Sequence, residues 1–158
     1  MKALFLSIHV LAAVILIGPI TAAASVFPRY AKDVLRSVDR SKAPGLLVAA
    51  AMHRITRGYA TPALAVPVFG IGLGAAMQVL GQTWVIVSMA LTAVAALLLV
   101  LQIIPIQSSV LTQLADGSAN AGTARAVRLL AVFTGLFATT WAVVVVLMIT
   151  RPGSSTGV

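Results

Sequence analysis

The stretch ALFLSIHVLAAVILIGPITAAASV, residues 3–26, contains no charged side chain. It is longer than the ~20 apolar residues that carry a helix across about 30 Å of hydrocarbon. Three more apolar runs follow at residues 59–80, 84–106 and 126–150, and Arg128 is the one charged residue in all four runs. Lipid offers no hydrogen bonds to the backbone, so only helices and closed barrels span it. The runs predict an all-α membrane protein, a bundle of four transmembrane helices.

The composition supports the same class. Hydrophobic residues make up 60% of the chain and charged residues 9%, with a mean hydropathy of +1.07, whereas soluble domains carry roughly 25% charged residues. We expect one integral membrane domain, residues 1–158, with a flexible tail at 151–158. The absence of cysteine excludes disulfides and thiolate metal sites. The abundance of alanine and valine suggests a bacterial source.

The distribution of lysine and arginine predicts the orientation. Residues 28–58 and 107–128 hold most of the cations, whereas the 81–83 turn holds none and the chain ends contribute only Lys2 and Arg151. Basic loops stay on the cytoplasmic side of a membrane. We therefore expect a multi-pass protein of the cytoplasmic membrane with N-out/C-out topology, in which loops 28–58 and 107–128 are cytoplasmic.

The basic segment 28–58 is the expected contact surface for the bilayer. A net charge of +8 would suggest nucleic acid in a soluble protein, but these cations flank apolar runs, so we expect anionic lipid headgroups or a protein partner and no nucleic acid. Residues 46–57 fit either a short interfacial helix or the start of the second transmembrane helix. The predicted contact residues are Arg29, Lys32, Arg36, Arg40, Lys42, His53, Arg54 and Arg57.

Gly70 and Gly74 form a GxxxG pair in the second apolar run. Small residues at this spacing let a neighbouring helix approach closely. The neighbour is either another helix of the same chain or a second copy in a homodimer or larger membrane complex.

His9 is the strongest candidate for a functional group. An ionisable side chain inside a membrane span is costly and marks a site by default. Counting residues from the predicted outer face places Met77, Met89 and Met148 at a depth similar to that of His9. An imidazole with thioethers suits haem b or copper. The alternative is that the methionines fill irregular packing gaps and that His9 bonds Ser7, Ser88 or a carbonyl freed by proline.

The pattern Leu6-Ser7-Ile8-His9-Val10-Leu11-Ala12-Ala13 resembles the start of small four-helix bacterial membrane proteins of the DUF2269 and copper-resistance-D-like kind, and residues 146–152 resemble their end. This resemblance implies His9 as a ligand of haem or copper. The haem-enzyme branch of that group has a lysine in the third helix, and this chain has none there.

No catalytic motif is present: there are no paired carboxylates, and the glycines at 70–74 lie inside a membrane span, so they cannot form a phosphate loop. Without such a motif, the sequence favours an accessory or interaction subunit that is not an enzyme. A haem- or copper-binding protein is the first alternative. A transporter or channel component is the second, although all three acids, Asp33, Asp39 and Asp116, lie outside the apolar runs.

Overall fold

The computed structural model describes residues 2–39 and 43–153. The predicted contact residues Arg40 and Lys42 lie outside this part of the chain. The helices, in chain order, are α1 (Lys2–Arg36), α2 (Pro44–Ala60), the 3₁₀ turn η1 (Pro62–Leu64), α3 (Ala65–Met77), α4 (Thr83–Leu97), the π-helical segment η2 (Leu98–Ile103), α5 (Ile104–Ala115) and α6 (Ala121–Thr150).

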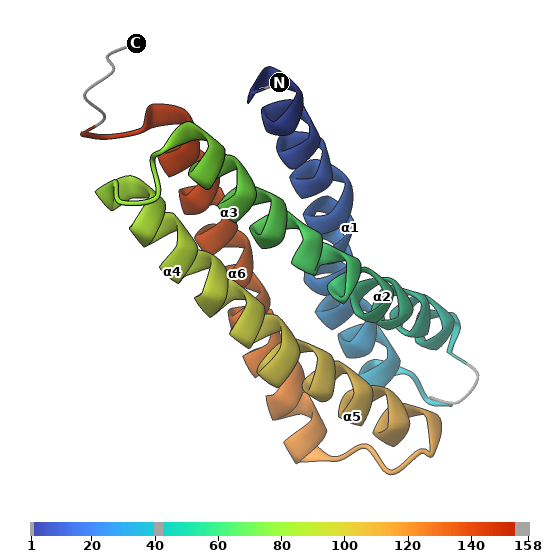
Figure 1. Ribbon diagram of the computed structural model, residues 1–158. Coiled ribbons are helices and arrows are strands. Elements are labelled where there is room, and N and C mark those ends of the chain that lie inside the picture. Colours follow the sequence, from blue (N-terminus) through green and yellow to red (C-terminus); the bar gives the residue numbers. More distant parts are fainter. Residues whose placement is uncertain (1, 40–42, 154–158) are drawn as a thin grey trace.

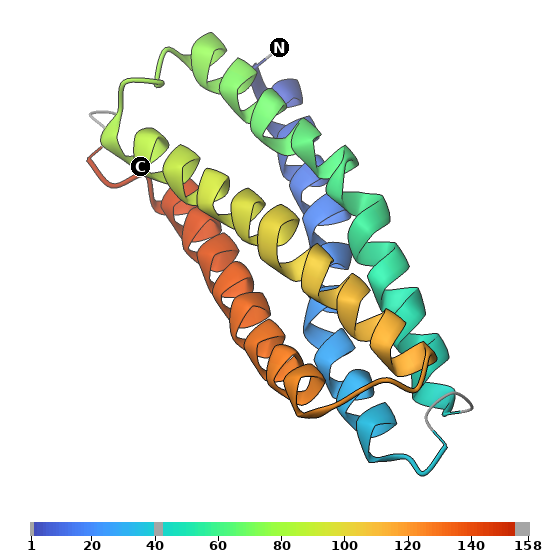
Figure 2. The same ribbon diagram turned by 90° about the horizontal axis from the view of Figure 1, so that it is seen from below.

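These helices join into four long rods, each apolar enough to cross a membrane: Leu4–Arg36, Pro44–Met77, Thr83–Ala115 and Ala121–Thr150. The rods run alternately up and down (Figures 1 and 2). The predicted all-α four-helix class of a multi-pass membrane protein is confirmed. The start of α1, the α3–α4 turn and the end of α6 lie at one end of the bundle, here called the terminal end. The α1–α2 and α5–α6 connections lie at the other, here called the basic end.

The connections at the basic end are much shorter than the sequence suggested. Helix α1 continues to Arg36 and α2 begins at Pro44, while α5 ends at Ala115 and α6 begins at Ala121. Residues 46–57 therefore belong to the second rod. The expected loops at 28–58 and 107–128 are mostly helical. A rod of 33 residues is about 50 Å long at 1.5 Å per residue, so the rods exceed the ~30 Å of hydrocarbon and extend beyond it.

Two of the rods contain a local change of helix type beside proline. Pro62 starts the 3₁₀ turn η1 between α2 and α3, and Pro105 follows directly after the π-helical segment η2. Proline lacks the N–H that a helix needs, so the backbone adjusts around it. Both rods nevertheless continue as single spans, because their apolar faces still pack on the bundle.

Local signals at two helix ends fix the remaining connections. Asn120 caps α6 by accepting hydrogen bonds from the backbone N–H groups of Gly122 and Thr123, while the Thr123 hydroxyl accepts one from the Asn120 N–H. This capping box satisfies backbone donors at the start of the helix. At the terminal end, Gln78 ends α3 in the left-handed conformation with φ 60°, so a tight turn leads directly into α4.

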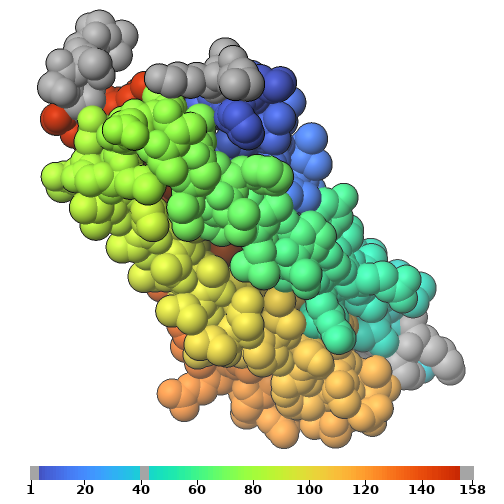
Figure 3. Space-filling view, viewed as in Figure 1, coloured from blue at the N-terminus to red at the C-terminus, as the bar shows by residue number. Residues whose placement is uncertain are grey.

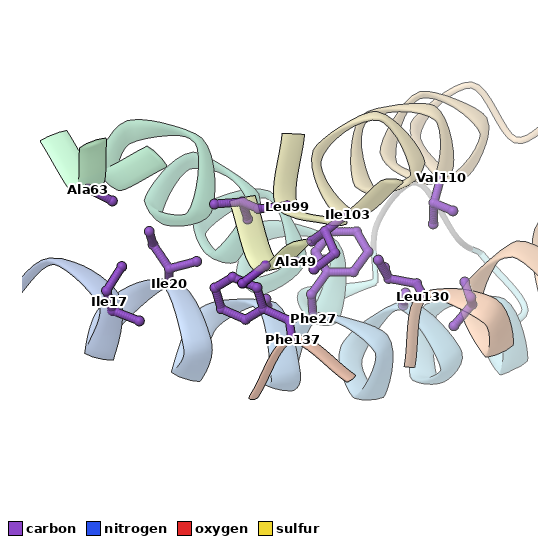
Figure 4. Packing of buried hydrophobic residues seen from close by; sticks show 14 of the residues in the cluster. Ile17, Ile20, Phe27, Ala49, Ala63, Leu99, Ile103, Val110, Leu130 and Phe137 are labelled. Carbon is purple, nitrogen blue, oxygen red and sulfur yellow. The ribbon is translucent and has the colours of Figure 1, made fainter. Parts of the chain in front are cut away.

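The tightest packing lies toward the basic end. Phe27 of α1, Ala49 of α2, Ile103 of η2 and Leu130 of α6 have no exposed surface, and Figure 4 shows their side chains meeting between the helices. The core cluster begins at Ile17 in α1. Toward the terminal end, α1 and α3 pack together, as do α4 and α6, and a cavity lies between the two pairs.

Candidate functional site

The cavity has a volume of about 380 Å³ and lies between α1, α3, α4 and α6. Figure 3 shows the corresponding furrow between α3 and α4, with atoms of α6 at its bottom. Its walls are mostly aliphatic, and the side chains with a nitrogen, oxygen or sulfur atom are His9, Met89, Thr92, Trp141 and Met148. A concave, mainly apolar site with a few converging polar groups is typical of small-molecule binding.

His9 forms part of the α1 wall and is only 6% exposed. Its ring lies directly over Gly70 of α3: a Cβ atom on that glycine would lie 2.9 Å from the His9 Cε1 atom, closer than atoms approach in folded proteins. The absence of a side chain at residue 70 therefore makes room for the imidazole. The GxxxG glycine holds α1 against α3 within one chain.

The hydrogen bonding of His9 is incomplete. Its Nδ1 atom is buried without a partner. The expected alternative bond to Ser88 is not formed, because the Ser88 hydroxyl is itself buried without a partner.

Two of the three methionines grouped with His9 by depth line the same cavity. Met89 comes from α4 and Met148 from α6, on the walls across from α1. Met77, the last residue of α3, does not line the cavity. Depth alone could not separate them, because the direction of each side chain depends on how its helix is rotated about its axis.

Trp141 is a site residue that the sequence did not single out. It lines the cavity, its ring packs edge-on to Phe137 at 6.4 Å between centroids, and its indole Nε1 is buried without a partner. A buried indole N–H normally finds an acceptor. A tryptophan in the middle of an apolar run, rather than at its end, was the signal in the sequence.

Gly74 also packs within the chain. A Cβ atom there would lie 2.6 Å from Cδ2 of Leu80, in the turn between α3 and α4. A Cβ atom added to Gly72, which lies between these two glycines, would meet no other atom within 4 Å. Gly70 thus packs against another helix of the same chain, whereas Gly74 packs against the turn that follows its own helix.

His53 lies apart from the cavity and points into the bundle. Its Nδ1 atom is 3.1 Å from Oε1 of Gln107 on α5. Gln107 is completely buried, and its Nε2 atom has no partner. Of the predicted contact residues on α2, Arg54 and Arg57 are exposed, while His53 is half-buried and links α2 to α5.

The other predicted contact residues surround the basic end. Arg29, Lys32 and Arg36 are exposed on the last part of α1. Arg125 and Arg128 are exposed at the start of α6. In the described part of the chain, no group of three or more His, Cys, Asp or Glu side chains could hold a metal ion, so the metal candidates depend on the thioethers around His9.

The chain matches no family model, no curated protein and no solved structure. The resemblance drawn from the first and last helices stays a prediction. The assignment of function therefore depends on the geometry around His9.

We predict that Gly70→Val destabilises the protein more than Gly72→Val, by about 1–3 kcal/mol, which is the usual cost of overpacking. Both variants place the same β-branched residue in α3, so the difference isolates the contact with His9. Unfolding in mixed micelles with increasing SDS measures it. In a His9→Ala background the difference should vanish; if it persists, the imidazole does not occupy the space over Gly70.

Proposed function

We propose that this protein binds a redox-active metal centre inside the membrane, with His9 as its protein ligand. The observation that carries the proposal is that His9, Met89 and Met148, from three different helices, line one apolar cavity. Imidazole and thioether are the donors that suit haem iron and Cu(I).

The cavity is larger than a bare copper ion needs. A volume of about 380 Å³ falls in the range of sites for organic molecules, 300–1,000 Å³, and a single ion would leave most of it empty. The helix pairs α1/α3 and α4/α6 form facing walls, with His9 on one and the thioethers on the other. His9 would hold the iron, and the thioether of Met89 or Met148 would be available on the opposite wall.

The propionates of a haem would need cations or water. Arg151 follows α6 one turn after Met148, and its guanidinium lies over the Trp84 ring at 5.9 Å from the centroid. Trp84 adjoins Val85, another lining residue. A basic side chain therefore stands near the terminal end of the cavity. Haem bound in this way would supply single-electron transfer.

We expect the protein purified in mild detergent, from cells supplied with haem precursor and copper, to carry a Soret band. His9→Ala should abolish the band because the axial nitrogen is lost, and Met89→Leu or Met148→Leu should shift or weaken it. Met77→Leu is the matched control, because it removes a thioether outside the cavity and should leave the spectrum unchanged. The visible spectrum and metal analysis of each variant are the measurements.

Near-stoichiometric copper without a Soret band, lost in His9→Ala, would assign the same site to Cu(I) instead of haem. A well-folded sample with neither would contradict the proposal. The accessory or interaction subunit that the sequence favoured would then be the preferred hypothesis. Identification of the proteins that co-purify with the chain would test it. The cavity does not support a transporter, because its wall has no carboxylate that could bind a coupling ion.

We also propose that the basic end faces the cytoplasm. Residues 28–58 and 107–128 of the sequence contain nine of its eleven lysines and arginines, and the other two are Lys2 and Arg151; such a bias sets orientation in bacterial inner membranes. The exposed cations at this end would lie among anionic headgroups.

The cysteine-free chain gives a direct test of this orientation. In intact cells, a membrane-impermeant maleimide should label Gly81→Cys, in the exposed turn at the terminal end, and should label Asp116→Cys, in the exposed loop at the basic end, only after lysis. The opposite pattern would place the basic end outside.

A further inference from the structure

A second hollow, of about 330 Å³, lies on the outward side of the second rod, apart from the His9 cavity. It is lined by Arg54, Ile55, Gly58, Tyr59 and Pro62. These positions follow the spacing of one helix face, i, i+1, i+4, i+5 and i+8. Gly58 leaves space at the centre of this face, since a Cβ atom there would meet nothing within 4 Å.

The groove lies at the boundary between hydrocarbon and water. Counting back from Met77 at the terminal end, about 20 residues or 30 Å of helix reach Arg57. Counting back from the end of α6 by a similar length reaches Arg128. The groove begins at Arg54 on the polar side of this level and ends at Pro62 on the apolar side, with the exposed Tyr59 between them. Tyrosine is common at this depth.

The two ends of the groove differ in chemistry as the two ends of a phospholipid do. The guanidinium of Arg54 can bond a phosphate through two parallel N–H groups. Gly58 and Pro62 offer a smooth apolar path for an acyl chain.

From these features we infer that the groove is a binding site for one anionic phospholipid of the bilayer, with the phosphate on Arg54 and an acyl chain over Gly58. The headgroup chemistry that fits Arg54 is a phosphate diester with a net negative charge, such as phosphatidylglycerol. The inference does not depend on the ligand of the His9 cavity, since no residue lines both.

Native mass spectrometry of the detergent-purified protein, with phosphatidylglycerol and phosphatidylcholine added at equal concentration, tests this site. We expect phosphatidylglycerol adducts to dominate. Arg54→Gln should weaken them about tenfold, the equivalent of one charge-assisted hydrogen bond, and Gly58→Leu should do so by filling the groove while keeping every charge. Arg125→Gln removes an exposed cation of the same end outside the groove and should leave binding unchanged.

Thermal unfolding without added lipid identifies any variant that is not folded, and Gly58→Ala is the milder substitute for Gly58→Leu, with a smaller expected loss. Two results would overturn the inference. Phosphatidylglycerol binding by Gly58→Leu at the wild-type level would show that the groove is not used. An equal loss in Arg125→Gln would show that the cations attract lipid only diffusely.

Discussion

Burial of the His9 imidazole among apolar helices is the constraint on which the half of the bundle toward the terminal end depends. Hydrocarbon offers this ring no hydrogen-bond partner, so the protein must provide its surroundings. Gly70 gives the ring room, while its Nδ1 atom has no hydrogen-bond partner. The close approach of α1 and α3 follows from this fit. The pair formed by α4 and α6 stays apart from the pair formed by α1 and α3, and the cavity lies between the two pairs.

The two halves of the molecule solve different packing problems. Toward the basic end, side chains without exposed surface fill the space between all four rods, and the His53–Gln107 bond ties α2 to α5. A rod of 33 residues is longer than the hydrocarbon is thick, and outside the hydrocarbon the burial of apolar side chains is driven by water. Within lipid no such drive acts between helices. An open cavity with unpaired polar atoms can therefore persist there, and a ligand would complete it.

The amino-acid pattern was sufficient for the four spans, because long runs without charge have one stable state in a bilayer. It was insufficient for the connections. Residues 28–36 and 44–58 contain enough charge to be mistaken for loops, yet Phe27, Ala31 and Val34 recur at helical spacing on α1, as do Ala49 and Thr56 on α2, and all five are fully buried. Their periodicity carried the information that the charges obscured.

The candidate site was partly visible in the sequence. His9 stood out because an intramembrane imidazole is rare, and depth along the helices correctly grouped it with Met89 and Met148 in one cavity. Helix rotation, which depth does not contain, separated Met77 from the cavity and brought Trp141 into it. The same limit misplaced His53, whose neighbours in sequence are exposed arginines but whose neighbour in space is Gln107.

The central claim is that the cavity beside His9 holds a ligand that the imidazole touches. An experimental density map of the protein purified in mild detergent tests it most directly. We expect non-protein density between the α1/α3 and α4/α6 walls, continuous with the His9 ring and reaching toward Met89 or Met148. A cavity closed by repacked side chains, with His9 turned away from Gly70 toward lipid, would contradict it.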